Sequence, residues 1–279
     1  MGVLVLASLA AWVLYDCSNS YGRTLASTGR TLTNLAIALG DKAEGSLGAV
    51  DLLLQTTADW YRTQPAEAGA GVNEALALRA ADIASVRLLA ITDAQGRIIF
   101  HSRPVTSAIL DVSDRAYFID QRDRGKPGVY VSEPLLLRLE RRPGIVLSRR
   151  LDNPDGTFRG IVMAVVELDQ FQRVYHAITL GPGSSIVLLR EDGTVLVREP
   201  PLPGAVVGQK FPDLAKLDGT GEEVVSGLDD KQRLFATSLV PGFPLVAAVT
   251  LDKAAALSGW HHDLLRVAIK LPLMLTLGA

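Results

Sequence analysis

A pattern of apolar and polar positions typical of a β-hairpin occurs twice in the chain, about 97 residues apart. The copies are residues 91–103 and 188–200, and they align on the turn glycines Gly96 and Gly193. In each copy an aliphatic run enters a polar turn, and a run of β-branched or aromatic residues leaves it, as in two antiparallel strands. The repeat therefore predicts two related lobes.

A second repeat supports this interpretation, because a pair of aliphatic runs ending in Leu-Asp also occurs twice. The paired runs are residues 145–151 with 160–169, and residues 234–239 with 244–252. Aspartate is a favoured N-cap, so we expect Asp169 to cap a helix over residues 170–178 and Asp252 to cap one from Lys253 onward. These copies are only about 83 residues apart, so the second lobe is expected to be a shorter version of the first.

Between residues 16 and 62, apolar positions recur at steps of three, four or seven, which predicts one long amphipathic helix. The stripe consists of Leu25, Leu32, Leu35, Leu39, Ala43, Leu47, Val50, Leu54, Ala58 and Tyr61. At about 1.5 Å per residue the helix would be on the order of 65 to 70 Å long, more than one small lobe needs. Either the stripe pairs with a second copy of the chain in a homodimer, or it packs along both lobes of one chain, and both can hold together. A flexible stretch, residues 64–71, is expected to follow.

Both ends of the chain are apolar. Residues 1–15 carry no charge, but they are fewer than the roughly 20 residues that span a bilayer. A basic start and a small-residue cleavage site, the marks of a signal peptide, are missing, so we expect a transmembrane helix that is shortened at its start. Residues 267–279, apolar except for Lys270, predict the first half of a second membrane helix, with a docked amphipathic helix as the alternative.

Composition and charge exclude several classes of function. A net charge of −2 does not suit a protein that must neutralise nucleic-acid phosphates. A single cysteine, Cys17, excludes an internal disulfide framework and a multi-cysteine zinc site. The sequence contains no phosphate-binding loop and no serine or cysteine nucleophile beside a base, so we expect no enzyme, cofactor or metal. The four histidines, which lack metal-ligand spacing, are His101, His176, His261 and His262.

Two short segments carry the remaining candidate chemistry. Residues 113–118 (SDRAYF) predict the start of a helix that is capped by Ser113 or Asp114 and ends near Gly125. Residues 128–134 (GVYVSEP) predict a short strand that Pro134 interrupts.

These segments, in this order, resemble the membrane-distal lobe of double Cache (dCache) sensor domains. The resemblance rests on Asp-Arg-x-Tyr-Phe at the helix start, Ser-x-Pro after the strand, Ile-x-Leu-Ser-Arg-Arg-Leu at 145–151 and Asp-Gly-x-Phe-x-Gly at 155–160. It covers roughly residues 16–262. Such PAS-like extracytoplasmic modules occur in histidine kinases, diguanylate cyclases and chemoreceptors.

The resemblance implies an α+β fold in which a long N-terminal helix precedes two PAS-like lobes with antiparallel sheets, flanked by membrane helices. The expected domains are a transmembrane helix (1–15), a stalk and dimerisation helix (16–63), a membrane-distal lobe (64–179), a membrane-proximal lobe (180–253), and a C-terminal helix running into a second transmembrane helix (254–279).

The resemblance also implies a ligand pocket at the helix start of the distal lobe. In amino-acid-binding members an arginine in Arg-x-Trp-Tyr holds the ligand carboxylate, and this position corresponds to Arg115, with Tyr117 and Phe118 at the aromatic places. A guanidinium beside a helix N-terminus suits a carboxylate. The family tyrosine and acidic residue are replaced here by Leu110 and Leu137. We therefore expect a small organic anion without an α-amine.

The candidate ligand contacts are Arg115, Tyr117, Asp114, Tyr130, Ser132 and Arg149. In the structural alternative, Asp114 and Arg115 form a surface ion pair while Tyr117 fills the core, where we also expect Phe118. Arg149 and Arg150 are adjacent on a strand, so at most one can enter a pocket. The basic run of Arg138, Arg141 and Arg142 is expected to be a solvated hairpin tip.

The sequence as a whole predicts an extracytoplasmic sensor region at the inner (cytoplasmic) membrane, with residues from about 16 to 262 in the periplasm. Its expected partners are a small organic anion, the membrane and a second copy of the chain. Ligand binding would shift the helices packed against the distal lobe and change the spacing or rotation of the segment that runs from Ala254 into the membrane. This movement would control a histidine kinase or diguanylate cyclase rather than a chemoreceptor domain. The alternative is a membrane-tethered interaction module with no small ligand.

Overall fold

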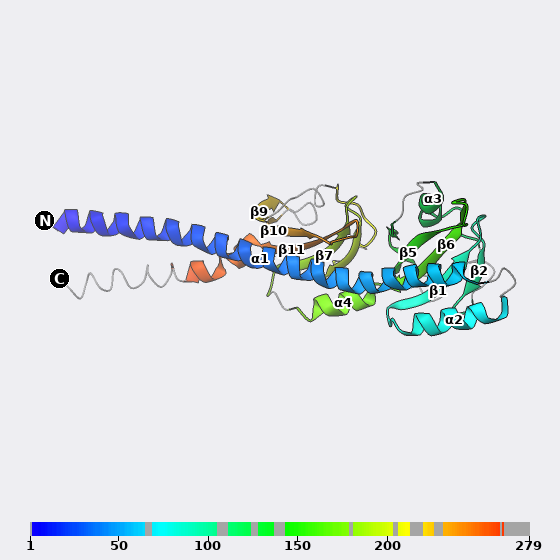
Figure 1. The fold of residues 1–279 in the computed structure, drawn as a ribbon. Coiled ribbons are helices and arrows are strands. Elements are labelled where there is room, and N and C mark those ends of the chain that lie inside the picture. The colour runs from blue at the N-terminus through cyan, green and yellow to red at the C-terminus, as the bar shows by residue number, and fades with distance from the viewer. Residues whose placement is uncertain are drawn as a thin grey trace.

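The chain folds as one long helix with two α+β lobes side by side along it (Figure 1). The structure, a computed structural model, describes residues 2–64, 69–104, 111–123, 128–136, 143–178, 181–202, 206–212, 220–225, 231–262 and 264. The first residues of α1 and the last described residues, 260–262 and 264, lie toward the same end of the molecule. We call the lobe nearer this end the proximal lobe and the other the distal lobe.

Helix α1 (Gly2–Arg62) is continuous over 61 residues and contacts both lobes. The predicted apolar stripe is confirmed, since eight of its residues are buried: Leu32, Leu39, Ala43, Leu47, Val50, Leu54, Ala58 and Tyr61. Leu25 and Leu35 are partly buried against the same core. The stripe packs on strands of both sheets, as one of the two predicted uses requires.

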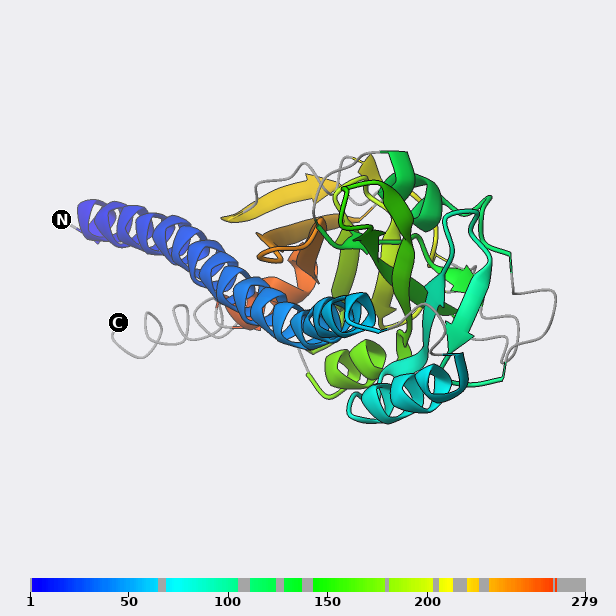
Figure 2. The same ribbon diagram turned by 45° about the vertical axis from the view of Figure 1, so that its right-hand side comes forward.

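The distal lobe is built on a six-stranded antiparallel sheet in the order β2-β1-β6-β5-β3, with β4 also paired to β5. Its strands are β1 (Val86–Thr92), β2 (Ile98–His101), β3 (Tyr130–Val131), β4 (Leu135–Leu136), β5 (Pro143–Asp152) and β6 (Phe158–Glu167). Helices α1 and α2 (Gly69–Ala81) cover one face, and α3 (Ala116–Asp123) lies on the other (Figures 1 and 2). The two faces of the sheet therefore belong to separate apolar clusters.

The proximal lobe is built on a five-stranded antiparallel sheet in the order β8-β7-β11-β10-β9. Its elements are β7 (Ser184–Arg190), β8 (Val195–Glu199), β9 (Thr220–Val225), β10 (Gln232–Leu239), β11 (Leu245–Asp252) and α6 (Lys253–Ala256). Helix α4 (Asp169–His176) joins the lobes. A Cβ atom on Gly40 of α1 would lie 3.3 Å from the Leu239 carbonyl oxygen, so α1 and β10 meet closely there.

The predicted duplication is confirmed and extends beyond the sequence repeat. Strands β1 and β2 pair around Gly96, and β7 and β8 pair around Gly193; these glycines have φ of +84° and +83°. Each glycine carbonyl oxygen accepts a backbone hydrogen bond at 2.9 Å from a residue farther along, Val112 in one lobe and Phe211 in the other. The two turns therefore hold equivalent segments in the two lobes.

Two details differ from the sequence-based expectation. Asp169 is the first residue of α4 and not its N-cap: Leu168 occupies that position, without a side-chain cap. Asp252 does cap α6, accepting a hydrogen bond from the Ala254 amide. The stretch expected to be flexible contains the start of α2, because Gly69 and Gly71 are helical.

The N-terminal part of α1 contacts the segment that follows α6 beside the proximal lobe. Trp260 Nε1 donates to Ser20 Oγ at 2.8 Å, and the indole lies edge-on to the Tyr21 ring with centroids 5.3 Å apart. Within the described part of the chain, no helix is both long and apolar enough to cross a membrane. The second predicted membrane segment, 267–279, lies outside the described residues.

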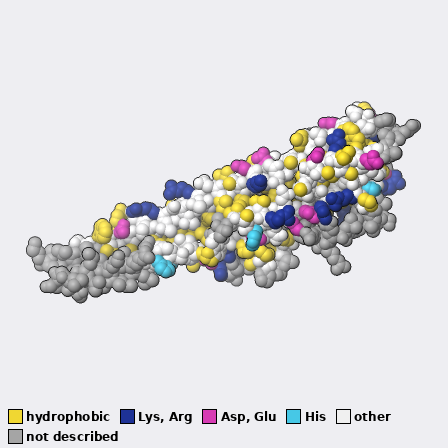
Figure 3. Space-filling view, turned by 90° about the horizontal axis from the view of Figure 1, so that it is seen from below, with side chains coloured by type: hydrophobic (Ala, Val, Ile, Leu, Met, Phe, Trp, Pro, Cys, Tyr) yellow, Lys and Arg dark blue, Asp and Glu magenta, His cyan; other side chains and the backbone are white. Residues whose placement is uncertain are grey.

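Among the described residues, basic and acidic side chains are interspersed along the elongated face seen in Figure 3. This distribution agrees with the near-neutral net charge of −2.

Candidate functional site

The start of α3 is fixed by the turn at Gly96. Val112 donates to the Gly96 carbonyl oxygen at 2.9 Å, and Arg97 forms an isolated β-bridge with Asp111. A Cβ atom on Gly96 would lie 2.7 Å from the Ser113 Cα, which explains the glycine at this close approach. Backbone and side-chain hydrogen bonds from Ser113, helped by the charge of Arg97, lower the pKa of Asp111. The segment that leads to Arg115 is therefore bonded to the turn at Gly96.

Helix α3 begins later than expected, at Ala116. The Arg115 carbonyl oxygen accepts hydrogen bonds from the Phe118 and Ile119 amides, both at 2.9 Å. Arg115 thus stands at the helix start, a position predicted for Ser113 or Asp114. The helical N–H groups at this end create a positive potential beside the guanidinium.

Arg115 and Asp114 form an ion pair at the surface. Arg115 Nε lies 3.4 Å from Asp114 Oδ1, with 35% of the arginine side chain and 75% of the aspartate side chain exposed. Pairs this exposed contribute about 0–1 kcal/mol to the free energy of folding. A ligand anion could therefore replace Asp114 at small cost.

The aromatic residues after Arg115 lie in the core between α3 and the sheet. Tyr117 and Phe118 are 6% and 1% exposed, and the Phe118 ring packs edge-on against Phe158 with centroids 5.6 Å apart. The Tyr117 carbonyl oxygen accepts a hydrogen bond from the Ser148 hydroxyl of β5 at 2.9 Å. Phe118 is a core residue, as predicted.

A residue that the sequence did not single out, Gln121, fixes the other end of α3. Its Nε2 donates to the carbonyl oxygens of Ser148 at 2.8 Å and Gly128 at 3.1 Å, and Gln121 is buried. Arg150 of β5 donates to the Gln121 and Arg122 carbonyl oxygens, both at 2.8 Å. Alternation along β5 places Ser148 and Arg150 on one face, and this was the signal available in the sequence.

Tyr130 and Ser132 lie at the β3 edge of the same face. Tyr130 is half-buried against the cluster that contains Tyr117. Ser132 is buried, and its hydroxyl group donates to the Glu133 carbonyl oxygen at 2.7 Å while its oxygen accepts from the Val146 amide at 2.9 Å. The Ser132 hydroxyl therefore joins β3 to β5, while Tyr130 adds an aromatic ring near α3.

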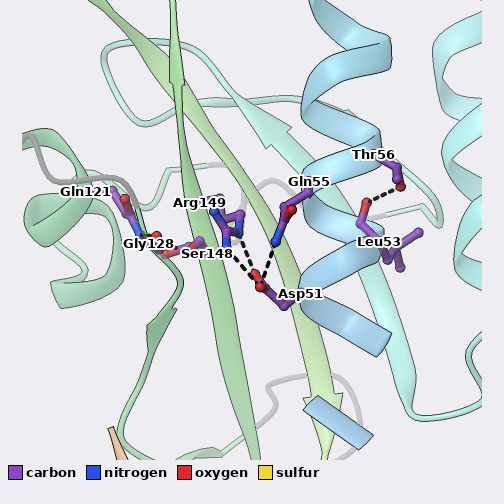
Figure 4. A network of polar contacts seen from close by, with 8 residues as sticks. All are labelled: Asp51, Leu53, Gln55, Thr56, Gln121, Gly128, Ser148 and Arg149. Carbon is purple, nitrogen blue, oxygen red and sulfur yellow. Dashed lines mark hydrogen bonds and ion pairs between the residues drawn. The ribbon is translucent and has the colours of Figure 1, made fainter. Parts of the chain in front are cut away.

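Arg149 lies on the opposite face of the sheet, toward α1 (Figure 4). Its Nε and Nη2 donate to the two carboxylate oxygens of Asp51 at 2.5 Å and 2.8 Å, and Gln55 donates to the same carboxylate. Of the adjacent arginines, Arg150 is therefore on the α3 side. This placement corrects the expectation that Arg149 shares a ligand site with Tyr117.

Several other predicted features lie outside the described residues. They are Leu110, Gly125, Leu137, and the basic run of Arg138, Arg141 and Arg142. Among the residues that the structure does describe, no group of three or more His, Cys, Asp or Glu side chains could hold a metal ion. The described residues of this face include the part-exposed Arg115 guanidinium at the start of α3 and the half-buried Tyr130 ring, while the Tyr117 ring is buried in the core.

Comparison with known proteins adds a family match. A family model described as Cache domain (dCache_1) matches residues 20–260. A crystal structure of the extracellular domain of a candidate histidine kinase, rpHK1S-Z16, is 30% identical in sequence, with a TM-score of 0.73; the match covers 85% of this chain and 99% of that one.

Two bacterial chemoreceptor domains share the fold. The ligand-binding domain of the amino acid chemoreceptor PctC of Pseudomonas aeruginosa PAO1, in complex with GABA, is 14% identical with a TM-score of 0.66, covering 81% of this chain and 100% of that one. The ligand-binding domain of the chemoreceptor CtaA of Pseudomonas fluorescens, in complex with L-serine, is 17% identical with a TM-score of 0.63, covering 81% and 98%. No curated protein matches the chain.

Proposed function

The chain belongs to the Cache domain family, in its double (dCache) form, and from this premise we propose that it is the extracytoplasmic ligand-sensing region of a membrane-bound bacterial signal-transduction receptor. Cache domains are sensor modules and not enzymes by themselves. The proposal includes the domain division expected from the sequence, with membrane helices at both ends and a periplasmic location for residues from about 16 to 262. The observation that carries it is the family match over residues 20–260.

The proposed ligand site lies at the start of α3 in the distal lobe, with Arg115 as the anion-binding group. Asp114 is the side chain that the ligand would displace, and Tyr117 and Tyr130 supply the neighbouring rings. PctC and CtaA were solved with GABA and L-serine, both of which carry a carboxylate. We infer a small carboxylate without an α-amine, since Leu110 and Leu137 stand where amino-acid-binding members carry a tyrosine and an acid.

The proposed output is a movement of helices relayed across the membrane to a cytoplasmic effector. A histidine kinase or diguanylate cyclase is favoured over a chemoreceptor domain, because the neighbour at 30% identity comes from a candidate histidine kinase. The ligand can shift this output only by binding one of two conformations more tightly. Helix α1 is the proposed homodimer contact, since Ile37 and Leu52 on its outer side are 46% and 60% exposed.

Thermal-shift measurements on the chain would test the ligand proposal. Organic acids, amino acids and polyamines should be compared, and a binder should raise the melting temperature with concentration as mass action requires. Arg115→Ala should abolish the increase. The matched control is Arg62→Ala, because Arg62 at the end of α1 also forms a surface ion pair, with Asp59 at 2.8 Å.

The outcomes separate the parts of the proposal. Stabilisation by amino acids or amines alone would overturn the carboxylate assignment. An unchanged melting temperature with every compound would favour the alternative, a membrane-tethered interaction module without a small ligand. One observation favours that alternative: Tyr117 and Phe118 already fill the space between α3 and the sheet.

A further inference from the structure

The two lobes meet at β3, the strand next to the candidate ligand site. Arg190, at the end of β7 in the proximal lobe, donates from Nη1 to the Val131 carbonyl oxygen at 2.8 Å. Its guanidinium carbon lies 5.7 Å from the centroid of the Tyr130 ring. Only 16% of the Arg190 side chain is exposed, so the proximal lobe places a mostly buried cation against the backbone and ring of a distal-lobe strand.

Three ionic contacts link Arg190 and its neighbours at this junction. Lys210 Nζ lies 2.7 Å from Glu133 Oε1 of the distal lobe and 3.4 Å from Asp192 Oδ2 of its own lobe. Asp192 Oδ1 is also 3.4 Å from Arg190 Nε. The Lys210 and Glu133 side chains are about half exposed and contribute little to stability alone. Arg190 is therefore the residue of this junction that binds β3 directly, through the Val131 carbonyl oxygen and the Tyr130 ring.

The duplicated turn explains why these residues gather there. In the distal lobe the turn at Gly96 holds the segment that leads to Arg115. In the proximal lobe the equivalent turn at Gly193 contains Asp192, and Thr194 forms a β-bridge with Lys210. The same structural unit thus positions the candidate site in one lobe and the contact between lobes in the other.

From these contacts we propose that Arg190 is a positioning residue for the candidate ligand site. It holds β3 and Tyr130 in place from the proximal lobe, and β3 in turn holds the β7–β8 turn. The ligand part of this inference rests on the proposed function, but the mutual restraint of β3 and the turn does not. Because the contact is direct, the restraint must act in both directions.

Hydrogen exchange on the full chain, without any ligand, tests the restraint. Arg190→Met should raise the exchange rate of the Ser132 amide by about tenfold, because local opening becomes easier. This N–H shares a peptide unit with the Val131 carbonyl group and donates to the Val146 carbonyl oxygen at 2.9 Å. Arg190→Lys keeps a donor for the Val131 carbonyl oxygen and should restore much of the protection. The matched control is Arg233→Met, since Arg233 donates to the Gly183 carbonyl oxygen within the proximal lobe.

The reciprocal variant is Tyr130→Leu, which removes the ring beside Arg190. It should raise exchange of the Gly193 and Thr194 amides, whereas Ile99→Ala, at an exposed position of the same lobe, should leave them unchanged. If Arg190→Met does not fold, Arg190→Lys and Tyr130→Leu still give the answer. Wild-type exchange rates in the folded variants, or equal increases in variants and controls, would overturn the proposal.

Failure of this experiment is distinct from failure of the proposed function. If the variants change hydrogen exchange but no compound binds in the thermal-shift series, the proposed restraint between the lobes stands and the proposed ligand site fails. If a carboxylate binds but the variants leave hydrogen exchange unchanged, the proposed ligand site stands and the proposed restraint fails.

Discussion

Gly96 and Gly156 show how surroundings, and not backbone angle alone, set the cost of a substitution. Both have positive φ, +84° and +81°. A Cβ atom on Gly96 would collide with Ser113, whereas one on Gly156 would meet nothing within 4 Å. At both positions an L-residue is strained, by about 1 kcal/mol, and only at Gly96 must a second segment also move.

Gly96→Ala should therefore lower the free energy of unfolding by more than Gly156→Ala does, with the difference on the order of 1–3 kcal/mol. It should also weaken binding of any ligand that needs Arg115, because Ser113 lies two residues before it. Urea titration of the two variants measures the difference. Equal losses would show that the turn does not hold the α3 segment.

The buried amide of Gln121 supports a second prediction. Gln121→Ala would leave the Ser148 and Gly128 carbonyl oxygens without its hydrogen bonds, which should cost about 1–3 kcal/mol. Gln95→Ala is the control, since Gln95 is exposed and donates to the Asp93 carboxylate through its backbone amide. Equilibrium urea unfolding checks this, and equal stability of the two variants would contradict it.

At the scale of elements, α1 has an inner side that the lobes cover and an outer side that they leave exposed. Leu54 is fully buried and Leu52 is 60% exposed, although they are two residues apart. Leu54→Ala should destabilise the chain by about 2–5 kcal/mol, because it opens a cavity in the core. Leu52→Ala should change stability by no more than about 0.5 kcal/mol.

The same pair of variants tests the proposed homodimer. If α1 pairs through its outer side, Leu52→Ala should weaken association in sedimentation equilibrium, while the monomer stays as stable as the wild type. A monomeric wild-type chain at high concentration would contradict dimerisation through this helix.

The elements themselves could be predicted from the sequence wherever an apolar period was long or repeated. The stripe of α1 and the two hairpins had such patterns, and all were found. Helix α2 lacked one, because its first residues are glycine and alanine, which suggest a linker. Asp169 failed as a cap because Leu168 already occupies the cap position, one residue earlier.

The candidate site was predicted less completely, for a reason that lies in β5. Alternation along the strand separates Arg149 from Arg150 but does not say which face meets α3. That choice depends on Asp51, which is about a hundred positions earlier in the chain and pairs with Arg149. Gln121 was missed because its partners are backbone carbonyl oxygens, and the alternation along β5 marks Ser148 and Arg150 but not the helix residue that meets them.

For the whole molecule, acid should loosen the contact between the lobes. Burial alone would raise the pKa of Asp192, but hydrogen bonds from Thr194 and the charges of Arg190 and Lys210 outweigh it and lower the pKa below 3.8. A carboxyl whose pKa is lower in the folded state adds stability above its unfolded pKa and loses it as the pH falls through the folded value.

Asp192→Asn should thus be less stable than the wild type at pH 7, and the difference should shrink at pH values below 3.8. Urea unfolding at several pH values measures it. A difference that grows on acidification would contradict the assignment. Asp155→Asn, at another hydrogen-bonded turn but far from the junction in the chain, should show the same trend without altering exchange in β3.

The close approach at Gly40 gives α1 a mechanical property. If the rigid helix pivots where β10 touches it, the arm from Gly40 to Asp51 is about 16 Å and the arm from Gly40 to Ser20 about 30 Å, at roughly 1.5 Å per residue. The helix is then a first-class lever with the proximal lobe as its fulcrum. A sideways push on Asp51 would arrive at Ser20 nearly doubled and reversed in direction, and Trp260 would be carried with it.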